Sequence, residues 1–400
     1  MDFEQYPDSH FRCLTRADVI EAARDVDIVA AVAEALMLHS AGQSVLPEEA
    51  YLGWTTPQGD SARLPAMPGA LVQDGRPPLI GMKTINASIG NPGRGIPRTQ
   101  GFTLLLDPET ARPLALMEAA YISAMRTAAV TALAVRHLAV EEPRQLALLG
   151  CGALAQAHVA LLLRTVPTLR RISLYDVAPD RAKSVARYIA LLPETADVGT
   201  VLADGPREAV RDAELVVPVT TVTRGYIEPD WLRPGTLVCH VSLDDLTEAA
   251  VLSAGTVIVD DWSLVRDDPR RLLGRMHRAG TLLGPDGTPR EGVTARPGAR
   301  RVDGTLGDVL AGRHPGRRDR DDGRTQDTPR STGQCLPVRG GHQRGAVPGT
   351  ESTRLRHVPF TVKRDMLKRM HGTDEHIGVE TLRQGTETVY QLPAGLRTEA

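Results

Sequence analysis

Cysteine is scarce in this sequence, and neither sign of charge is in excess. The four cysteines, Cys13, Cys151, Cys239 and Cys335, are scattered and show no CxxC or Cys/His spacing of the metal-binding type. We therefore expect no disulfide framework and no metal site, and the reducing cytoplasm is the default compartment. The formal net charge of −2 predicts no general attraction to nucleic acid or to an anionic membrane.

The sequence also shows no pattern typical of a targeting signal or of a membrane-spanning segment. Residues 1–14 lack the basic stretch followed by an apolar one that a secretory signal requires. No uninterrupted apolar run is long enough to span a membrane, and no internal repeat is visible. What remains is an ordinary globular composition, with 42% apolar and 24% charged residues. Because 400 residues exceed what one core usually serves, we expect two domains.

The first 135 residues mix helical and strand patterns. Thr15 is placed to cap a helix that begins at Arg16, with Asp18 at its third position. The apolar spacing predicts four further features: a helix at about 27–39 stopped by Gly42, short strands and turns at 47–101, a hairpin of strands at 101–107 and 114–117, and an alanine-rich helix at 119–138. This mixture predicts an α+β domain over residues 1–135.

From residue 145 onward, short apolar strands alternate with helices. The strands are expected at 146–149, 171–175, 215–219, 237–241 and 257–259, and the helices at 153–164 and 179–192. Strands that alternate with helices of this length are typical of a parallel, doubly wound sheet. The sequence therefore predicts an α/β fold with a Rossmann-type domain over residues 136–299.

A glycine-rich string follows the first of these strands. Gly150 is expected to make the tight turn, Gly152 to let the backbone approach a pyrophosphate, and Ala155 to allow close packing of the helix on the strand. The N-terminus of that helix offers free N–H groups to phosphates. Such a string alone is weak evidence, but its place between a strand and a helix makes it strong. The alternative is a tight turn that binds no ligand.

Asp176 ends the next strand, twenty-four residues after Gly152. It can accept both ribose hydroxyls, and its charge would repel a 2′-phosphate, so the sequence favours NAD over NADP. Arg181, the nearest arginine that follows, lies five positions on. We also expect Ala153, Leu154 and Thr220 to contact the cofactor. Cys151 is interpreted as a small loop residue rather than a nucleophile.

Several motifs occur together in an order that resembles the ornithine cyclodeaminase/mu-crystallin family. They are Gly81-Met-Lys83-Thr-Ile85, Asn91-Pro92-Gly93 with Gly95-Ile-Pro97, Leu106-Asp107-Pro-Glu-Thr110, and Met125-Arg126-Thr-Ala-Ala129 ahead of the glycine-rich loop. The resemblance covers about residues 10–322. It implies a homodimer whose N-terminal halves form the interface and the substrate site, which makes residues 1–135 a substrate and dimerisation domain with a closing segment at 300–322.

The resemblance also implies roles for particular residues. The lysine matching Lys83 and the arginine matching Arg126 bind the substrate carboxylate, and the aspartate matching Asp245 or Asp244 handles the reacting amine or water. Adjacent residues at a strand end point in opposite directions, so only one aspartate can enter the site, and we choose Asp245. The alternatives are that Lys83 is a surface strand residue and Arg126 part of a structural ion pair.

Two positions depart from the family pattern. Pro47 is followed by Glu48-Glu49-Ala50-Tyr51 where many members have an arginine that grips the carboxylate. We take Arg63, in the next expected strand, as its substitute for binding substrate. Leu154 replaces the usual glutamine of the glycine-rich loop, which leaves the phosphate site intact.

Within the family, residues 122–126 and 240–246 are most similar to the N-(2-amino-2-carboxyethyl)-glutamate dehydrogenases, which make 2,3-diaminopropionate for siderophores and peptide antibiotics. The resemblance implies NAD-dependent oxidation of an amino-acid C–N bond, with 2,3-diaminopropionate and 2-oxoglutarate as products. Two alternatives stay open. One is an ornithine cyclodeaminase, which forms proline and ammonia, and the other is a non-catalytic mu-crystallin-like protein that binds NAD(P)H.

The end of the chain has a different composition. Residues 313–356 hold ten arginines and no lysine, and they cannot bury enough surface to offset their ordering entropy. The family pattern stops at Asp322, so we interpret 323–400 as an atypical tail. Our hypothesis is a reading-frame change near Asp322, which reading the coding DNA tests. The alternative is a genuine basic tail.

Overall fold

The computed structural model describes residues 11–195 and 197–282. All of them belong to the first of two compact units, Met1–Arg320. The predicted closing segment at 300–322, the tail at 323–400 and the last part of the predicted Rossmann domain, 283–299, lie outside the described residues. The predicted domain boundaries therefore stay predictions.

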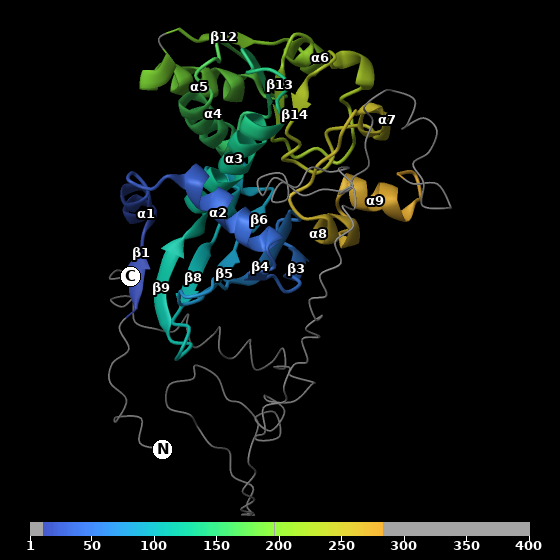
Figure 1. The fold of residues 1–400 in the computed structure, drawn as a ribbon. Coiled ribbons are helices and arrows are strands. Elements are labelled where there is room, and N and C mark those ends of the chain that lie inside the picture. The colour runs from blue at the N-terminus through green and yellow to red at the C-terminus, as the bar shows by residue number, and fades with distance from the viewer. Residues whose placement is uncertain (1–10, 196, 283–400) are drawn as a thin grey trace, which may run out of the picture. The chain divides into compact units, whose positions relative to one another are not determined.

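A mixed sheet forms the N-terminal part of the described chain, with strand order β1-β9-β8-β5-β4-β6-β7, and with β2 and β3 also paired to β4. Only β1 and β9 pair in parallel among these strands. Figure 1 shows β9, β8, β5 and β4 side by side. The strands are β1 (Arg12–Leu14), β2 (Ser44–Val45), β3 (Ala50–Thr55), β4 (Ser61–Leu71), β5 (Leu79–Thr84), β6 (Asn86–Ser88), β7 (Thr99–Gln100), β8 (Phe102–Leu106) and β9 (Pro113–Glu118).

Three helices accompany this sheet, and the predicted caps of the first two are present. They are α1 (Arg16–Ala22), α2 (Ile28–Ser40) and α3 (Ala119–Leu138). Thr15 and Asp18 form a complete capping box at the start of α1, as predicted. Gly42, just after α2, has a φ of 75°, a conformation that a glycine adopts without strain.

Part of the segment 47–101 differs from the prediction. Its strand β4 is eleven residues long rather than short, because its successive parts pair with four different strands. The motif loop at 91–97 contains a 3-10 helix, Asn91–Arg94. The predicted turn at Asp107 is confirmed, since its carboxylate accepts hydrogen bonds from the backbone N–H groups of Glu109 and Thr110.

A second sheet has five parallel strands in the order β12-β11-β10-β13-β14. The chain starts at the central strand β10 and adds strands outward in both directions, which confirms the predicted doubly wound topology. The strands are β10 (Gln145–Leu149), β11 (Arg171–Tyr175), β12 (Gly199–Leu202), β13 (Leu215–Pro218) and β14 (Leu237–Val238). The helices are α4 (Ala153–Thr165), α5 (Pro179–Ala190), α6 (Pro206–Val210), α7 (Glu248–Ser253), α8 (Trp262–Asp267) and α9 (Leu272–Arg278), with 3-10 turns at Pro193–Thr195 and Pro229–Trp231.

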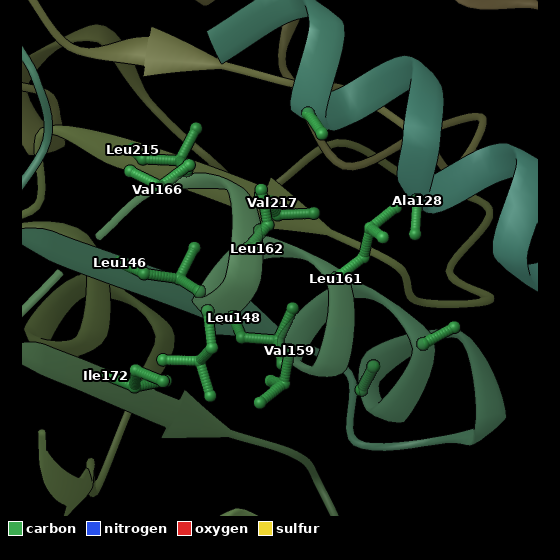
Figure 2. Close-up of a cluster of buried hydrophobic side chains, with 14 of the residues drawn as sticks. Ala128, Leu146, Leu148, Val159, Leu161, Leu162, Val166, Ile172, Leu215 and Val217 are labelled. Atoms are coloured by element: carbon green, nitrogen blue, oxygen red, sulfur yellow. The ribbon is translucent and has the colours of Figure 1, made fainter. Parts of the chain in front are cut away.

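Alternation along β10 places core residues on both faces of this sheet. Leu146 and Leu148 join one apolar cluster, and Ala147 and Leu149 join another. Figure 2 shows the larger cluster, in which strand side chains meet Val159, Leu161 and Leu162 of α4. Both faces of the sheet are therefore covered, as the near-continuous apolar strands require.

Two strand predictions in this part were wrong. Residues 257–259 form no strand, because Val257 packs beside the cluster of Val251, Leu272 and Met276 instead of joining the sheet. A short apolar run does not distinguish a buried strand from another buried segment. β14 is also two residues long rather than five, and β12 was not predicted at all.

Helix α3 connects the two sheets: it follows β9 of the mixed sheet and packs against the core of the parallel sheet. It begins directly after β9, and Glu118 caps it by accepting hydrogen bonds from the N–H groups of Ala120 and Tyr121. Its second half, including Ala128, Ala132 and Leu133, is buried in the same cluster as Leu146 and Leu148. The position of Arg126, in the middle of this helix, is therefore set by both parts of the chain.

Candidate active site

The glycine-rich loop has the geometry of a phosphate site. Gly150 has a φ of 89°, and a Cβ there would lie 2.9 Å from the carbonyl oxygen of Val219, so only glycine fits. A Cβ on Gly152 would meet nothing within 4 Å, which leaves that side of the backbone open to a ligand. Gly152 caps α4 without a side-chain hydrogen bond, so no side chain occupies the anion-binding end of the helix. These residues fit the pyrophosphate of a dinucleotide.

Asp176 binds the glycine-rich loop as well as facing the cleft. One carboxylate oxygen accepts the Cys151 N–H at 2.7 Å, and the other accepts the Ala178 N–H at 2.8 Å. The side chain lines the same cleft as Gly150 and Gly152. Burial, reinforced by the nearby Asp176 charge, raises the pKa of the Cys151 thiol to about 12. This agrees with the interpretation of Cys151 as an unreactive loop residue.

Ala153, Leu154 and Thr220 also line this cleft. The Thr220 hydroxyl donates to Asp245 at 2.6 Å, and its N–H donates to the Ser242 hydroxyl at 3.2 Å. Thr220 thus connects the nucleotide side of the cleft to the predicted catalytic aspartate, a connection that the sequence did not indicate.

The cleft extends from the glycine-rich loop to the mixed sheet and has a volume of about 3110 Å³. A site for a drug-sized ligand occupies roughly 300–1,000 Å³. The cleft is therefore large enough to hold a dinucleotide and an amino-acid substrate together. Arg63 and Arg126 are among its lining residues.

Strand register places Lys83 on the cleft side of the mixed sheet. Arg63, Pro65 and Met67 alternate along β4, and all three line the cleft. Lys83 on β5 lies directly opposite Met67 in the antiparallel pair, and paired residues project to the same face. The sheet therefore presents Arg63 and Lys83 on one face.

The pKa values of Lys83 and Arg126 both lie below their ordinary values. Burial, then the positive charge of Arg126, lowers the pKa of Lys83 to about 8, against an opposing influence from Glu49. Part of the Arg126 side chain is exposed to the cleft, but protein atoms surround its guanidinium. This desolvation lowers the pKa of Arg126, although the negative charge of Asp260 acts to raise it. Two cations held close in a partly desolvated place are suited to bind a carboxylate.

The sequence predicted only one member, Arg63, of a second pair of cations. Arg98 lines the cleft with Arg63, and burial followed by the charge of Arg63 lowers the pKa of Arg98. Arg98 comes directly after the Gly95-Ile-Pro97 motif, but nothing in one sequence distinguishes it from an exposed loop arginine. Arg271 and Glu49 were also missed, because their proximity to Arg126 and Lys83 arises from tertiary structure alone.

The two adjacent aspartates have different surroundings. Asp245 is fully buried, and its carboxylate accepts hydrogen bonds from Thr220, from Ser242 and, at 3.1 Å, from the Tyr226 hydroxyl. Burial acts to raise the pKa of Asp245, but hydrogen bonds from His240, Ser242 and Thr220 outweigh it, so the pKa lies below its ordinary value. Asp244 instead lines the cleft and is paired with Arg275.

No cluster of three or more His, Cys, Asp or Glu side chains suited to a metal ion occurs at 11–195 or 197–282. Within these described ranges, the helices are too short or too polar to cross a membrane.

The fold and the loop define a Rossmann-type, NAD-dependent oxidoreductase, because the tight glycine turn, the open helix end and an acid at the end of the next strand occur together. The model of the ornithine cyclodeaminase/mu-crystallin family matches residues 11–324, and the chain belongs to this family. The chain is thus an enzyme of amino-acid metabolism. The predicted resemblance, over about residues 10–322, is confirmed.

Named relatives agree with this assignment. The chain is 34% identical over 255 residues to N-((2S)-2-amino-2-carboxyethyl)-L-glutamate dehydrogenase of Staphylococcus aureus, covering 62% of this chain and 74% of that protein. It is 28% identical over 309 residues to alanine dehydrogenase of Archaeoglobus fulgidus, covering 76% and 85%. The crystal structure of CmnK is similar with a TM-score of 0.66 and 38% identity, covering 76% of this chain and 84% of CmnK.

We predict that Asp176→Asn weakens NAD binding about 10- to 100-fold, as the loss of a charge-assisted hydrogen bond of about 1–3 kcal/mol requires. The amide keeps one acceptor oxygen but loses the charge that holds the loop N–H and the ribose. Calorimetric titration with NAD measures the change. Asp180→Asn, at an exposed position that pairs with Lys183, is the matched control and should bind as wild type does. Equal affinities of the three proteins would contradict the assignment.

We also predict a pH effect on substrate binding that depends on Lys83. Its pKa of about 8 means that the ammonium is mostly present at pH 7 and mostly lost at pH 9. If the ammonium holds the substrate carboxylate, KM should rise about ten-fold across this range. In Lys83→Arg the guanidinium stays charged, so the rise should shrink. Identical KM profiles for both proteins would remove Lys83 from the carboxylate site.

Proposed function

We propose that the enzyme oxidises the C–N bond of an N-(2-amino-2-carboxyethyl)-glutamate-like conjugate. With NAD and water as co-reactants, the products are 2,3-diaminopropionate, 2-oxoglutarate, NADH and a proton. The observation that carries the proposal is a double pair of cations: Arg63, Arg98 and Arg126 line one cleft, and Lys83 lies next to Arg126 on the sheet face that borders it. A substrate with a single carboxylate needs only one of these pairs.

The charges also discriminate between candidate substrates. Arg63 and Arg98 line the same cleft, and the charge of Arg63 helps to lower the pKa of Arg98, so a carboxylate between them would offset their repulsion. The side-chain ammonium of ornithine would instead add a third positive charge there. Two like charges about 4 Å apart repel by about 4 kcal/mol at an effective dielectric constant of about 20. This argument supports a substrate with several carboxylates over ornithine.

The relatives support the same choice. The Staphylococcus aureus protein is named for a conjugate of this type, and it is 34% identical to this chain. The Archaeoglobus fulgidus relative is named for alanine, at 28% identity. The second cation pair is the feature by which an assay distinguishes the two substrates.

The residues of the chain divide the work of the reaction. Bound NAD would supply the acceptor for the hydride that leaves the substrate Cα. Lys83 and Arg126 would hold the carboxylate on that carbon and orient its C–H bond, which reduces the entropy to be lost on reaching the transition state. Arg63 and Arg98 would bind a distal carboxylate. Siderophore or antibiotic biosynthesis is the use of 2,3-diaminopropionate that this reaction would serve.

We predict that the enzyme forms NADH with the conjugate and that 2,3-diaminopropionate and 2-oxoglutarate appear in equal amounts. Absorbance at the NADH band and mass analysis of the products measure both. Arg98→Met should raise KM for the conjugate at least ten-fold while changing turnover of a monocarboxylic amine such as alanine little. Conversion of ornithine to proline and ammonia without net NADH would identify a cyclodeaminase instead. Binding of NAD without turnover of any amino acid in the panel would identify a mu-crystallin-like binding protein.

We also propose a homodimer formed through the mixed sheet. Every residue of β3 is exposed, among them Tyr51, Leu52 and Trp54, and in the described ranges β3 pairs only with β4. An apolar strand with a free edge is a site for association with another chain. The archaeal alanine dehydrogenase of similar fold, at 25% identity and a TM-score of 0.59, is described as a dimer with bound NAD.

We therefore predict that light scattering finds a dimer for the wild-type chain and that Leu52→Lys shifts it toward monomer. Leu191→Lys is the matched control, because Leu191 is also exposed but follows α5 on the Rossmann sheet. A monomeric wild-type protein, or a dimer that tolerates Leu52→Lys unchanged, would rule out this interface.

A further inference from the structure

A histidine lies between the cleft and the buried carboxylate of Asp245. His240 lines the cleft, and its side chain is 21% exposed. Its Nε2 atom lies 3.5 Å from a carboxylate oxygen of Asp245 and 3.1 Å from the Asp245 backbone nitrogen. One edge of the imidazole is therefore fixed against Asp245, while the side chain also borders the space that the substrate would occupy.

Asp245 itself has no access to that space. Its side chain is fully buried, and it is absent from the residues that line the cleft. Both of its carboxylate oxygens already accept hydrogen bonds, one from Thr220 and Tyr226 and the other from Ser242. A carboxylate in this position can orient and charge-stabilise a neighbour, but it cannot exchange a proton with a substrate directly.

We propose that His240 is the catalytic residue that carries the proton of the substrate amine, with Asp245 as the positioning residue behind it. The proposal rests on oxidation of a substrate C–N bond in this cleft, but not on which amino acid carries that bond. A histidine held by a buried carboxylate is an arrangement well suited to general acid–base catalysis, because the carboxylate fixes the ring and stabilises the imidazolium.

The proton balance assigns two steps to His240. In the first, the substrate Cα loses a hydride to NAD, and the secondary ammonium becomes an iminium by losing one nitrogen proton to His240. In the second, water adds to the iminium carbon and one of its protons passes to the nitrogen. His240 then returns its own proton to the same nitrogen, and the C–N bond breaks. The second proton of the water is released as the carbonyl forms, leaving a 2-oxo acid and a primary ammonium. The substrate Cα is oxidised by two electrons, which leave with the hydride and are carried by NADH.

Asp244 is the competing group on this wall of the cleft. It also lines the space, but its carboxylate is paired with Arg275 of α9 and its side chain is only 13% exposed. A carboxylate whose hydrogen bond is directed at an arginine is held away from the substrate space, so its pairing favours a structural role. Substitution of Asp244 therefore provides a direct comparison with His240.

The test compares His240→Ala, Asp245→Asn and Asp244→Asn on whichever amine of the substrate panel the wild-type enzyme oxidises. Loss of a general acid–base typically costs about 10²- to 10⁴-fold in rate, so kcat of His240→Ala should fall by that factor while calorimetric NADH affinity stays within about two-fold. Added imidazole should restore part of the rate, because a small base can enter the vacated space. His137→Ala, at another cleft-lining histidine, should keep its rate and ignore imidazole.

The expected pattern has two further parts. Asp245→Asn should lower kcat with little change in KM, and imidazole should not restore it, since the histidine is still present. Asp244→Asn should keep most of the rate. Loss of activity in Asp244→Asn with a nearly normal His240→Ala would overturn the proposal, and so would a His240→Ala defect confined to KM or insensitive to imidazole.

A chemical measurement keeps the proposal testable apart from the substrate assignment. Carbethoxylation by diethyl pyrocarbonate, located by peptide mass analysis, should modify His240 in the ligand-free enzyme, because the reagent needs an accessible ring nitrogen. Resistance of His240 under conditions that modify His137 would show that its ring does not reach the cleft, and the proposal would fail. If the conjugate is not a substrate but another amine is, the proposed substrate is wrong while the role of His240 is still measured.

Discussion

The packing of α3 against α4 is the interaction on which both halves of the site depend. Between these helices, the Thr131 hydroxyl and His158 Nε2 lie 3.1 Å apart, and His158 Nδ1 bonds to the Leu154 carbonyl oxygen at 2.7 Å. Burial lowers the pKa of His158, so it stays neutral in this apolar contact. Because Arg126 is on α3 and the phosphate loop opens α4, this one contact fixes a substrate cation relative to the cofactor site.

Repulsion between cations is the second constraint. Lys83 lies near Arg126 and Arg98 near Arg63, each pair in a partly desolvated position, and this arrangement costs free energy until a ligand offsets it. Protein anions supply part of the compensation through Glu49 and Asp260. The remaining positive charge favours an anionic ligand, and it can take the place of the arginine that many family members have after Pro47.

The carboxylate of Asp245 shows how burial changes a residue's role. An aspartate at this point of the chain is expected to meet the substrate, yet four side chains surround it, from Thr220, Tyr226, Ser242 and His240. Burial, together with the charge of Asp245, raises the pKa of Tyr226, which therefore stays a hydrogen-bond donor. The group that reaches the cleft from this network is His240.

The sequence by itself determined the local features of this protein. The capping box at Thr15, the turn at Asp107, the alanine-rich helix over 119–138, the glycine-rich loop and the doubly wound order all follow from nearest-neighbour chemistry and periodicity. Tertiary structure alone decided which distant side chains meet. It placed Arg98 with Arg63 and buried Asp245 behind His240, and it kept the apolar run at 257–259 out of the sheet. Such pairings depend on strand register and burial between segments far apart in the chain, and spacing along one sequence carries no information about either.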